Sequence, residues 1–374
     1  MSYTSGSKST SFDGTPQNQV VSGNQSILAG RFKLTSSYEN YTAKEMRFTT
    51  GSSLPIASAT LKDNATGATI ATIPYDNTNS YFNFTGLNIA IPASTSKRVD
   101  LYWNLSVPSA DASSTNVNAV ATLTYVKFAD SQGAETTDTN SRAANETYVF
   151  RAVPTISTVP LSNSKIINNA EMDLYKLTVA APSQGTVSIK QLKFNVNWSD
   201  SGTADTLELD SLKFFEDGVD ITSTVAITEE DSASDAESTN VVSENTSKII
   251  VVWDGDSEES VITAGTTKTY TLKGSPDGFN ETGATDTAKD SVAIQFVPDA
   301  AHQTAGYNYI NQGTTLTLIE KLYSSATANA SAENANLIWS DNSAVAHSPD
   351  DDAGTADWSN SYLFNSVSSQ SLSF

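Results

Sequence analysis

Short segments in which apolar and polar residues alternate recur along the chain, and they limit its fold more than any other feature. The apolar phase of LKFNVNW (192–198) consists of Leu192, Phe194, Val196 and Trp198. VDLYWNL (99–105) has the same pattern, with Val99, Leu101, Trp103 and Leu105. Because successive side chains of a strand point to opposite faces, both segments predict strands that are buried on one face. No stretch of three helical turns carries a convincing apolar stripe, so the sequence predicts an all-β fold.

These segments occur twice, in the same order. GRFKLT (30–35) matches LYKLT (174–178), and KEMRF (44–48) matches KQLKF (190–194). The matches continue with 60–73 against 211–225, 91–101 against 262–272, and 118–128 against 290–297. The second copy has longer loops, chiefly the acidic stretch 228–240, and surface loops are where insertions are tolerated. The pattern indicates an internal duplication, and its short strands with turns between them predict two tandem Ig-like β-sandwiches.

Pro154 and Pro160 bracket a short extended linker between the copies. The predicted division is a polar N-terminal arm (1–20), a first sandwich (21–153) and a second sandwich (154–374) with acidic insertions and extra C-terminal strands. The arm has few apolar residues and is expected to be ordered only by a sheet edge, so it is a possible donor strand for a neighbouring subunit. Residues from about 300 onward match nothing in the first copy, and we expect them to add strands to the second sandwich or to a neighbouring molecule.

Charge and composition exclude several functions. The net charge of −21 opposes binding to nucleic acid and to anionic membranes, and it attracts divalent cations. The chain has no cysteine, which excludes thiol chemistry. It has two histidines, which nearly excludes catalytic triads and metal sites built from several histidines. No apolar run is long enough to span a bilayer, and no signal peptide is visible. Since phosphate-binding and hydrolase motifs are also missing, the chain is not expected to be an enzyme.

Calcium is the one ligand that the acidic loops suggest. In WDGDSEES (253–260), acidic residues alternate around a glycine that permits a sharp bend, and NWSDSGTADTLELD (197–210) offers a second acidic loop. The oxygen ligands proposed from these loops are Asp254, Asp256, Glu258, Asp200 and Asp205. A charged hairpin tip without metal is the alternative for each loop.

The segment AHSPDDDAGTADWSN (346–360) raises the same question. It contains His347, three consecutive aspartates and a tryptophan. A cluster of Ser, Pro, Asp and Gly between strands is typical of a turn, and His347 has no obvious partner, so a solvated surface loop is the first interpretation. A calcium site that includes Asp350 and Asp352 is the second, and a catalytic cluster is the third.

This organisation resembles tandem Ig-like cell-surface proteins of bacteria, which include S-layer-like, adhesin-like and filament-forming proteins. The C-terminal stretch LIWSDNSAVAHS…DWSNSYL resembles a segment that recurs at the ends of such proteins. The resemblance implies an extracellular or cell-surface location and a structural subunit of a filament, pilus or surface layer. Together with the polar N-terminal arm, this leads us to expect that copies of the chain join by β-strand addition. The alternatives are an adhesin or carbohydrate-binding module that recognises surface glycans, and a phage or virion decoration protein.

Overall fold

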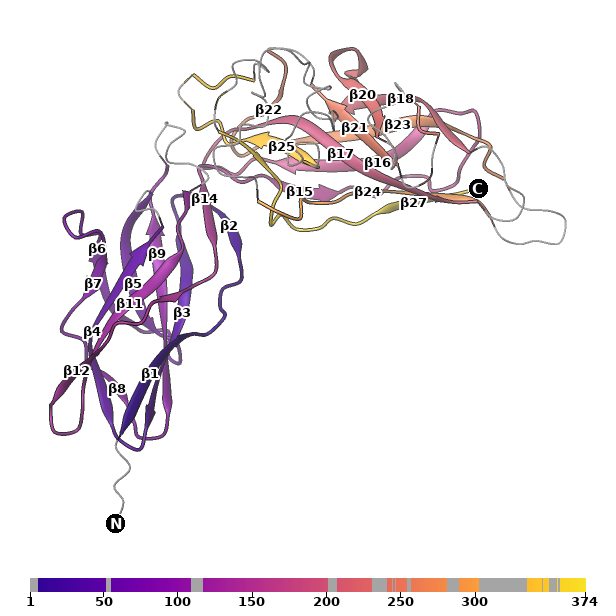
Figure 1. Cartoon of the computed structure of the whole chain (residues 1–374). Coiled ribbons are helices and arrows are strands. Elements are labelled where there is room, and N and C mark those ends of the chain that lie inside the picture. Colours follow the sequence, from indigo (N-terminus) through magenta and orange to yellow (C-terminus); the bar gives the residue numbers. More distant parts are fainter. Residues whose placement is uncertain are drawn as a thin grey trace, which may run out of the picture. The chain divides into compact units, whose positions relative to one another are not determined.

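The computed structural model describes most of the chain, and each of its two compact units is built from β-strands (Figure 1). The first unit ends at Arg151 and the second begins at Ala152. Among the described residues, no helix has the length and apolar character needed to cross a membrane. The described residues are 6–51, 55–108, 117–200, 207–230, 241–243, 245, 247–253, 257–280, 289–302, 335–344, 346–349, 355 and 357–374.

The first unit has two main sheets. One has the order β1 (Ser7–Phe12), β3 (Ser26–Ser37), β9 (Ser96–Leu105), β5 (Ile56–Asp63), β6 (Thr69–Pro74). The other has the order β12 (Glu135–Asp138), β11 (Ala121–Ala129), β4 (Tyr41–Thr50), β7 (Phe82–Phe84), with β8 (Ile89–Ile91) beside β4 and β13 (Arg142–Ala143) beside β11. A small third sheet contains β10 (Val117–Asn118), β14 (Thr147–Phe150) and β2 (Gln19–Ser22). The two main sheets are those of a β-sandwich.

The second unit repeats this arrangement. Its smaller sheet has the order β15 (Thr155–Thr158), β16 (Met172–Ala180), β23 (Thr267–Asp277), β18 (Glu208–Glu216), β19 (Val219–Asp220). Its larger sheet has the order β20 (Ala226–Glu230), β21 (Lys248–Val252), β17 (Val187–Ser199), β24 (Ser291–Phe296), β27 (Gln370–Ser373). Beside β17 also lie β22 (Ser260–Ile262) and β25 (Leu337–Ser340), and β26 (Trp358–Asn360) pairs with β25. A short 3-10 helix (Thr222–Thr224) precedes β20.

The all-β prediction is confirmed, and the five matched segment pairs occupy equivalent places in the two units. For example, β3 corresponds to β16 and β4 to β17, each with the same neighbours in its sheet. An ion pair is repeated as well: Lys97 contacts Asp63 in the first unit, and Lys268 contacts Glu216 in the second. Strand order and a charged pair therefore recur together.

The C-terminal residues complete the second sandwich. In the first unit, β11 pairs with β4 along its length, placing Leu123 opposite Phe48 and Phe128 opposite Ala43. In the second unit this position is shared by two strands, because Phe296 of β24 lies opposite Phe194 and Trp339 of β25 lies opposite Ile189. Strands β26 and β27 then pair with β25 and β24 much as β12 and β13 pair with β11. The tail thus has counterparts that sequence comparison did not detect.

Asp299 holds the two halves of this interrupted strand position together. Its carboxylate accepts hydrogen bonds from the backbone N–H of Asn336 at 2.7 Å and from the backbone N–H of Ser361 at 2.8 Å. Burial raises the pKa of Asp299, and the hydrogen bonds to Ser361 and Asn336 oppose that shift. Asp299 therefore joins the start of the segment between β24 and β25 to its end at Asn336.

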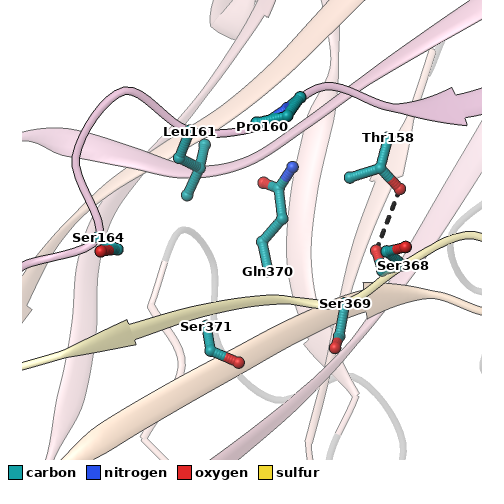
Figure 2. Close-up of a pocket in the computed structure, with 8 residues that line it drawn as sticks. All are labelled: Thr158, Pro160, Leu161, Ser164, Ser368, Ser369, Gln370 and Ser371. Carbon is teal, nitrogen blue, oxygen red and sulfur yellow. Dashed lines mark hydrogen bonds between the residues drawn. The ribbon is translucent and has the colours of Figure 1, made fainter.

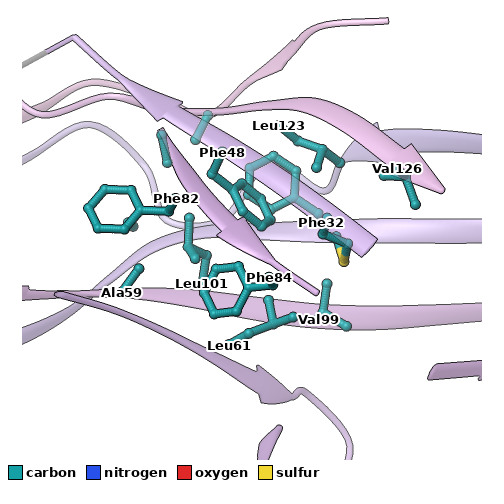
Figure 3. Close-up of a cluster of buried hydrophobic side chains, with 14 of the residues drawn as sticks. Phe32, Phe48, Ala59, Leu61, Phe82, Phe84, Val99, Leu101, Leu123 and Val126 are labelled. Atoms are coloured by element: carbon teal, nitrogen blue, oxygen red, sulfur yellow. The ribbon is translucent and has the colours of Figure 1, made fainter. Parts of the chain in front are cut away.

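The core of the first unit lies between its two main sheets (Figure 3). Phe32 and Phe48 lie 5.2 Å apart between ring centroids, and Phe48 contacts Phe84 edge-on at 5.9 Å. The buried indole of Trp103 donates to the carbonyl of Ala119 at 2.8 Å, as a buried tryptophan requires. The prediction for 99–105 is confirmed, since Val99, Leu101, Trp103 and Leu105 are all buried.

The polar phase of β17 is where the alternation argument fails. Leu192, Phe194 and Val196 are buried as predicted, whereas Trp198 is only partly buried. Lys193, predicted to face solvent, is buried too. The residues before β25 lie along this part of the strand, where the carbonyl of Asn336 accepts the backbone N–H of Lys193 at 2.8 Å. The tail thus covers a surface that looks solvated when β17 is considered alone.

We predict that Trp339→Ala destabilises the second unit by about 3–5 kcal/mol, because it removes a fully buried aromatic side chain from the core. Phe128→Ala at the equivalent position should destabilise the first unit by a similar amount. Calorimetric unfolding of both variants measures this, with each substitution lowering the melting temperature of its own unit. If both substitutions lowered one and the same transition, the prediction that each acts on its own unit would be contradicted.

Candidate functional site

Only two of the proposed calcium ligands lie among the described residues. Asp200 is exposed at the end of β17. Glu258 is half-buried, and its backbone carbonyl accepts a hydrogen bond from Nζ of Lys190 at 2.8 Å. Asp254, Asp256, Asp205, Asp350 and Asp352 lie outside the described residues. Within the described part of the chain, no three acidic or histidine side chains are grouped as a metal site requires, so calcium binding stays a prediction.

The segment after β25 contributes to a cluster of buried and half-buried polar side chains. His347 lies between two carboxylates, with Nδ1 2.9 Å from Asp357 and Nε2 2.9 Å from Glu259. Asp357 directly precedes β26, and Glu259 directly precedes β22. The imidazole also packs against Trp358, with 5.1 Å between ring centroids. His347 therefore links the C-terminal strands to a loop that lies 88 residues earlier in the chain.

Asp357 is the centre of this cluster. Its side chain is completely buried. It accepts hydrogen bonds from Oγ of Ser340 at 2.9 Å and from the backbone N–H of Ala344 at 3.2 Å, and Thr355 also donates to it. A buried carboxylate is tolerated when its lone pairs are satisfied and a cation lies beside it, and both conditions hold here.

The cluster shifts two pKa values in opposite directions. Burial alone would lower the pKa of His347, but the hydrogen bonds and negative charges of Asp357 and Glu259 outweigh it and raise the pKa to about 9. Burial alone would raise the pKa of Asp357, but hydrogen bonds from His347 and Thr355 and the imidazolium charge lower it to about 2. At neutral pH the pair is therefore an ion pair.

The residue types resemble a serine–histidine–aspartate triad, but the geometry does not. Ser340 is fully buried, and its hydroxyl points to Asp357 at 2.9 Å, whereas Nδ1 of His347 lies 3.5 Å away. A triad needs an accessible hydroxyl bonded to the imidazole, with the carboxylate on the other ring nitrogen. The cluster is built to hold a loop in place.

The first interpretation of 346–360 as a solvated loop is therefore wrong for its described ends. His347 has two carboxylate partners, and Asp357 and Trp358 are buried. Sequence reasoning missed Glu259 because nothing local links it to His347. The two residues come together only through the pairing of β17 with both β22 and β25.

A second polar feature surrounds the C-terminal strand. A groove of about 330 Å3 lies between β27 and residues 158–164, and the side chain of Gln370 extends across it (Figure 2). The Gln370 amide accepts from the backbone N–H of Lys176 at 2.9 Å and donates to the Lys176 carbonyl at 3.1 Å. It therefore satisfies the backbone N–H of Lys176, whose carbonyl also accepts from the backbone N–H of Val159 at 2.9 Å. In β27, the backbone N–H of Ser373 donates to the carbonyl of Ser164, and the carbonyl of Ser373 accepts from the backbone N–H of Ile166.

Comparison with known proteins gives no assignment. No protein-family model and no curated protein sequence matches the chain. Among solved structures, CBD12 of CALX1.2 matches with a TM-score of 0.26 and 11% identity, covering 80% of this chain and 85% of that one. The serine-rich repeat adhesion glycoprotein of Streptococcus agalactiae matches with a TM-score of 0.17 and 12% identity, covering 78% and 90%.

A third similar structure is the secreted serine protease VesC from Vibrio cholerae. It matches with a TM-score of 0.21 and 12% identity, covering 76% of this chain and 49% of that one. The chain thus spans about half the length of that protein. TM-scores this low carry no argument about function.

We predict that the second unit loses stability as pH rises from about 6.5 to 9. The pKa of His347 in the folded chain lies above its ordinary value of 6.5. The stability that protonated His347 contributes is therefore complete below about pH 6.5 and is lost as pH rises through about 9. The loss is at most roughly 3 kcal/mol. On the acid side, the contribution of Asp357 is complete above about pH 4 and is lost as pH falls through about 2.

Urea unfolding between pH 5.5 and 9.5 measures this slope. The variant His347→Gln should flatten it, whereas His302→Gln, which changes the other histidine, should leave it unchanged. An identical slope in wild type and His347→Gln would show that the imidazolium does not stabilise the fold.

Proposed function

We propose that the chain is a structural subunit of an extracellular assembly at the cell surface, either a filament or pilus or a surface layer. Copies join by β-strand addition, with the N-terminal strand of one copy inserted beside β3 of the next. The observation that carries this proposal is the way β1 is held in its sheet. The role is non-enzymatic, which agrees with the buried Ser340 hydroxyl.

Strand β1 is an edge strand held by its backbone ladder and by a few side-chain contacts, among them Phe12, whose ring lies 5.9 Å from that of Phe32. It pairs with β3 from Ser7 opposite Ser37 to Phe12 opposite Phe32, and Thr10 is its one fully buried side chain. Thr10 also accepts from Arg142 through its carbonyl at 2.8 Å and donates to Asp138 at 2.7 Å. Every one of these partners belongs to the remainder of the unit. A neighbouring copy therefore offers β1 the same ladder and the same contacts, which is the condition for exchange between subunits.

The acidity of the chain gives calcium a role in such an assembly. Copies that each carry a net charge of −21 repel one another, and bound divalent cations reduce that repulsion. The acidic loops at 253–260, 197–210 and 346–360 are the proposed sites.

We predict that the purified chain forms ordered filaments or sheets in millimolar calcium and that these dissolve in chelator. Negative-stain electron microscopy under both conditions measures this. Changing Asp254 and Asp256 to Asn should weaken the calcium requirement or the assembly. The control changes Glu135 and Glu171 to Gln, which removes the same charge from exposed positions. Monomers under both conditions would contradict the assembly role, whereas assembly that ignores calcium would contradict only the metal sites.

We predict that a disulfide between β1 and β3 prevents assembly. Ser9 lies directly opposite Thr35, and opposed residues of an antiparallel pair are close enough for a disulfide. Because the chain has no native cysteine, Ser9→Cys with Thr35→Cys forms one defined bond. The oxidised variant should stay monomeric and should assemble after reduction.

The matched control links β5 to β6 through Thr60→Cys with Thr72→Cys, which also face each other across a strand pair. This variant should assemble whether oxidised or reduced. If the β1–β3 disulfide leaves assembly intact, β1 is not exchanged, and the subunits must join through another surface.

A further inference from the structure

Two turns meet at one end of the first unit. The turn between β3 and β4 carries Tyr38, and the turn between β8 and β9 carries Ser94. The backbone N–H of Ser36 donates to the carbonyl of Thr95 at 3.0 Å, and the backbone N–H of Ala93 donates to the side chain of Asn40 at 2.8 Å. The two turns therefore form one surface.

Tyr38 projects from this surface into solvent. Its exposed fraction is 68%, and it is the one aromatic residue classed as exposed in the described part of the chain. The other large aromatic side chains there are buried or partly buried. A single large aromatic ring left in water at the tip of a domain is informative, because tyrosine supplies much contact area at low entropic cost when a ligand covers it.

The backbone at this position is unfavourable for a tyrosine. Tyr38 has a φ of 66° and Ser94 has a φ of 57°, both in the left-handed region that glycine adopts most readily. In the equivalent turn of the second unit, the counterpart of Ser94 is Gly265, which adopts a φ of 73° without steric strain. The counterpart of the Tyr38 turn, APSQGT (181–186), has no aromatic residue. A side chain at a position whose backbone favours glycine suggests that this side chain has a function.

Beside Tyr38 lies an open polar groove of about 390 Å3. Its lining consists of Lys33, Tyr38 and the hydroxyl-bearing residues of 35–37 and 94–96. The side chain of Lys33 has no ion-pair partner among the described residues, although the chain is strongly acidic. Two lining hydroxyl groups already donate within the protein, the buried Ser36 to the carbonyl of Glu39 and Thr95 to that of Pro92. The groove thus combines an aromatic face, the remaining serine and threonine hydroxyl groups, and one cation.

We propose that this surface, formed by Tyr38, Lys33 and the hydroxyl groups of the two turns, binds a pyranose ring of an acidic glycan. The apolar face of the sugar stacks on the Tyr38 ring, its hydroxyl groups bond to the serine and threonine side chains, and its carboxylate lies beside Lys33. The site belongs to the first unit alone, because the second unit lacks the aromatic residue. This inference adds a ligand to the chain and does not depend on the assembly role.

The test is binding of the full chain to immobilised oligosaccharides, with affinities from calorimetry. The probes are oligogalacturonate and an alternating uronate–hexosamine oligomer as microbial polysaccharides, sialyllactose as a host glycan, and a neutral N-acetylglucosamine hexamer. Wild type is expected to bind at least one acidic probe and to prefer it to the neutral one. Which acidic probe binds distinguishes the microbial from the host source.

Substitutions then separate a binding role from a structural one. Tyr38→Ala and Tyr38→Gly should lower the affinity at least tenfold, whereas Tyr38→Phe should retain it. Tyr38→Gly should also raise the melting temperature of the first unit, because it relieves the backbone strain. Lys33→Gln should remove the preference for acidic over neutral probes. The control Val219→Ala changes an equally exposed apolar residue of the second unit and should have no effect on binding.

Three results would overturn the proposal. The first is no binding of wild type to any of the probes. The second is unchanged affinity in Tyr38→Gly, which would place any binding elsewhere on the chain. The third is a lower melting temperature for Tyr38→Gly, which would show that the tyrosine is retained because it stabilises the turn.

Discussion

Backbone pairing along both edges of β17 holds the larger sheet of the second unit together. On one edge β17 pairs with β21 and β22, and on the other with β24 and β25. On the second edge the two strands come from separate parts of the chain, so the register of β17 decides whether distant segments meet. The burial of Lys193 and the contact between His347 and Glu259 both follow from this shared strand.

The two units have equivalent sheets, but different interactions stabilise them. In the first, a continuous β11 lines β4, and a phenylalanine-rich core fills the space between the sheets. In the second, the same position is divided between β24 and β25, and buried polar groups compensate for the interruption. Asp299 binds the ends of the insertion, Asp357 and His347 hold the following loop, and Gln370 accepts from the backbone N–H of Lys176. Each of these four side chains has hydrogen-bond partners, as burial of polar atoms requires.

Most of the fold could be predicted from the sequence. The alternation of apolar and polar residues predicted the strands, because the two-residue period of a strand is visible in a short segment. The matched segments identified equivalent strands in both halves. The polar supports could not be found this way. His347 and Glu259 are 88 residues apart, and their contact depends on pairing that no local pattern encodes. Tyr38 was also missed, because the sequence does not show whether an aromatic residue at a turn points inward or outward.

The divided strand position has a consequence for synthesis of the chain on the ribosome. The first unit can close once β14 has emerged, but the second waits for Trp339 and for β27 near its C-terminal end. The roughly 40 residues between β24 and β25 take roughly 2–8 s to translate. Throughout that time the part of the β17 edge that pairs with β25, residues 188–192, is open to any other nascent chain. Ribosomes that translate the same message side by side therefore bring together incomplete chains with matching open edges.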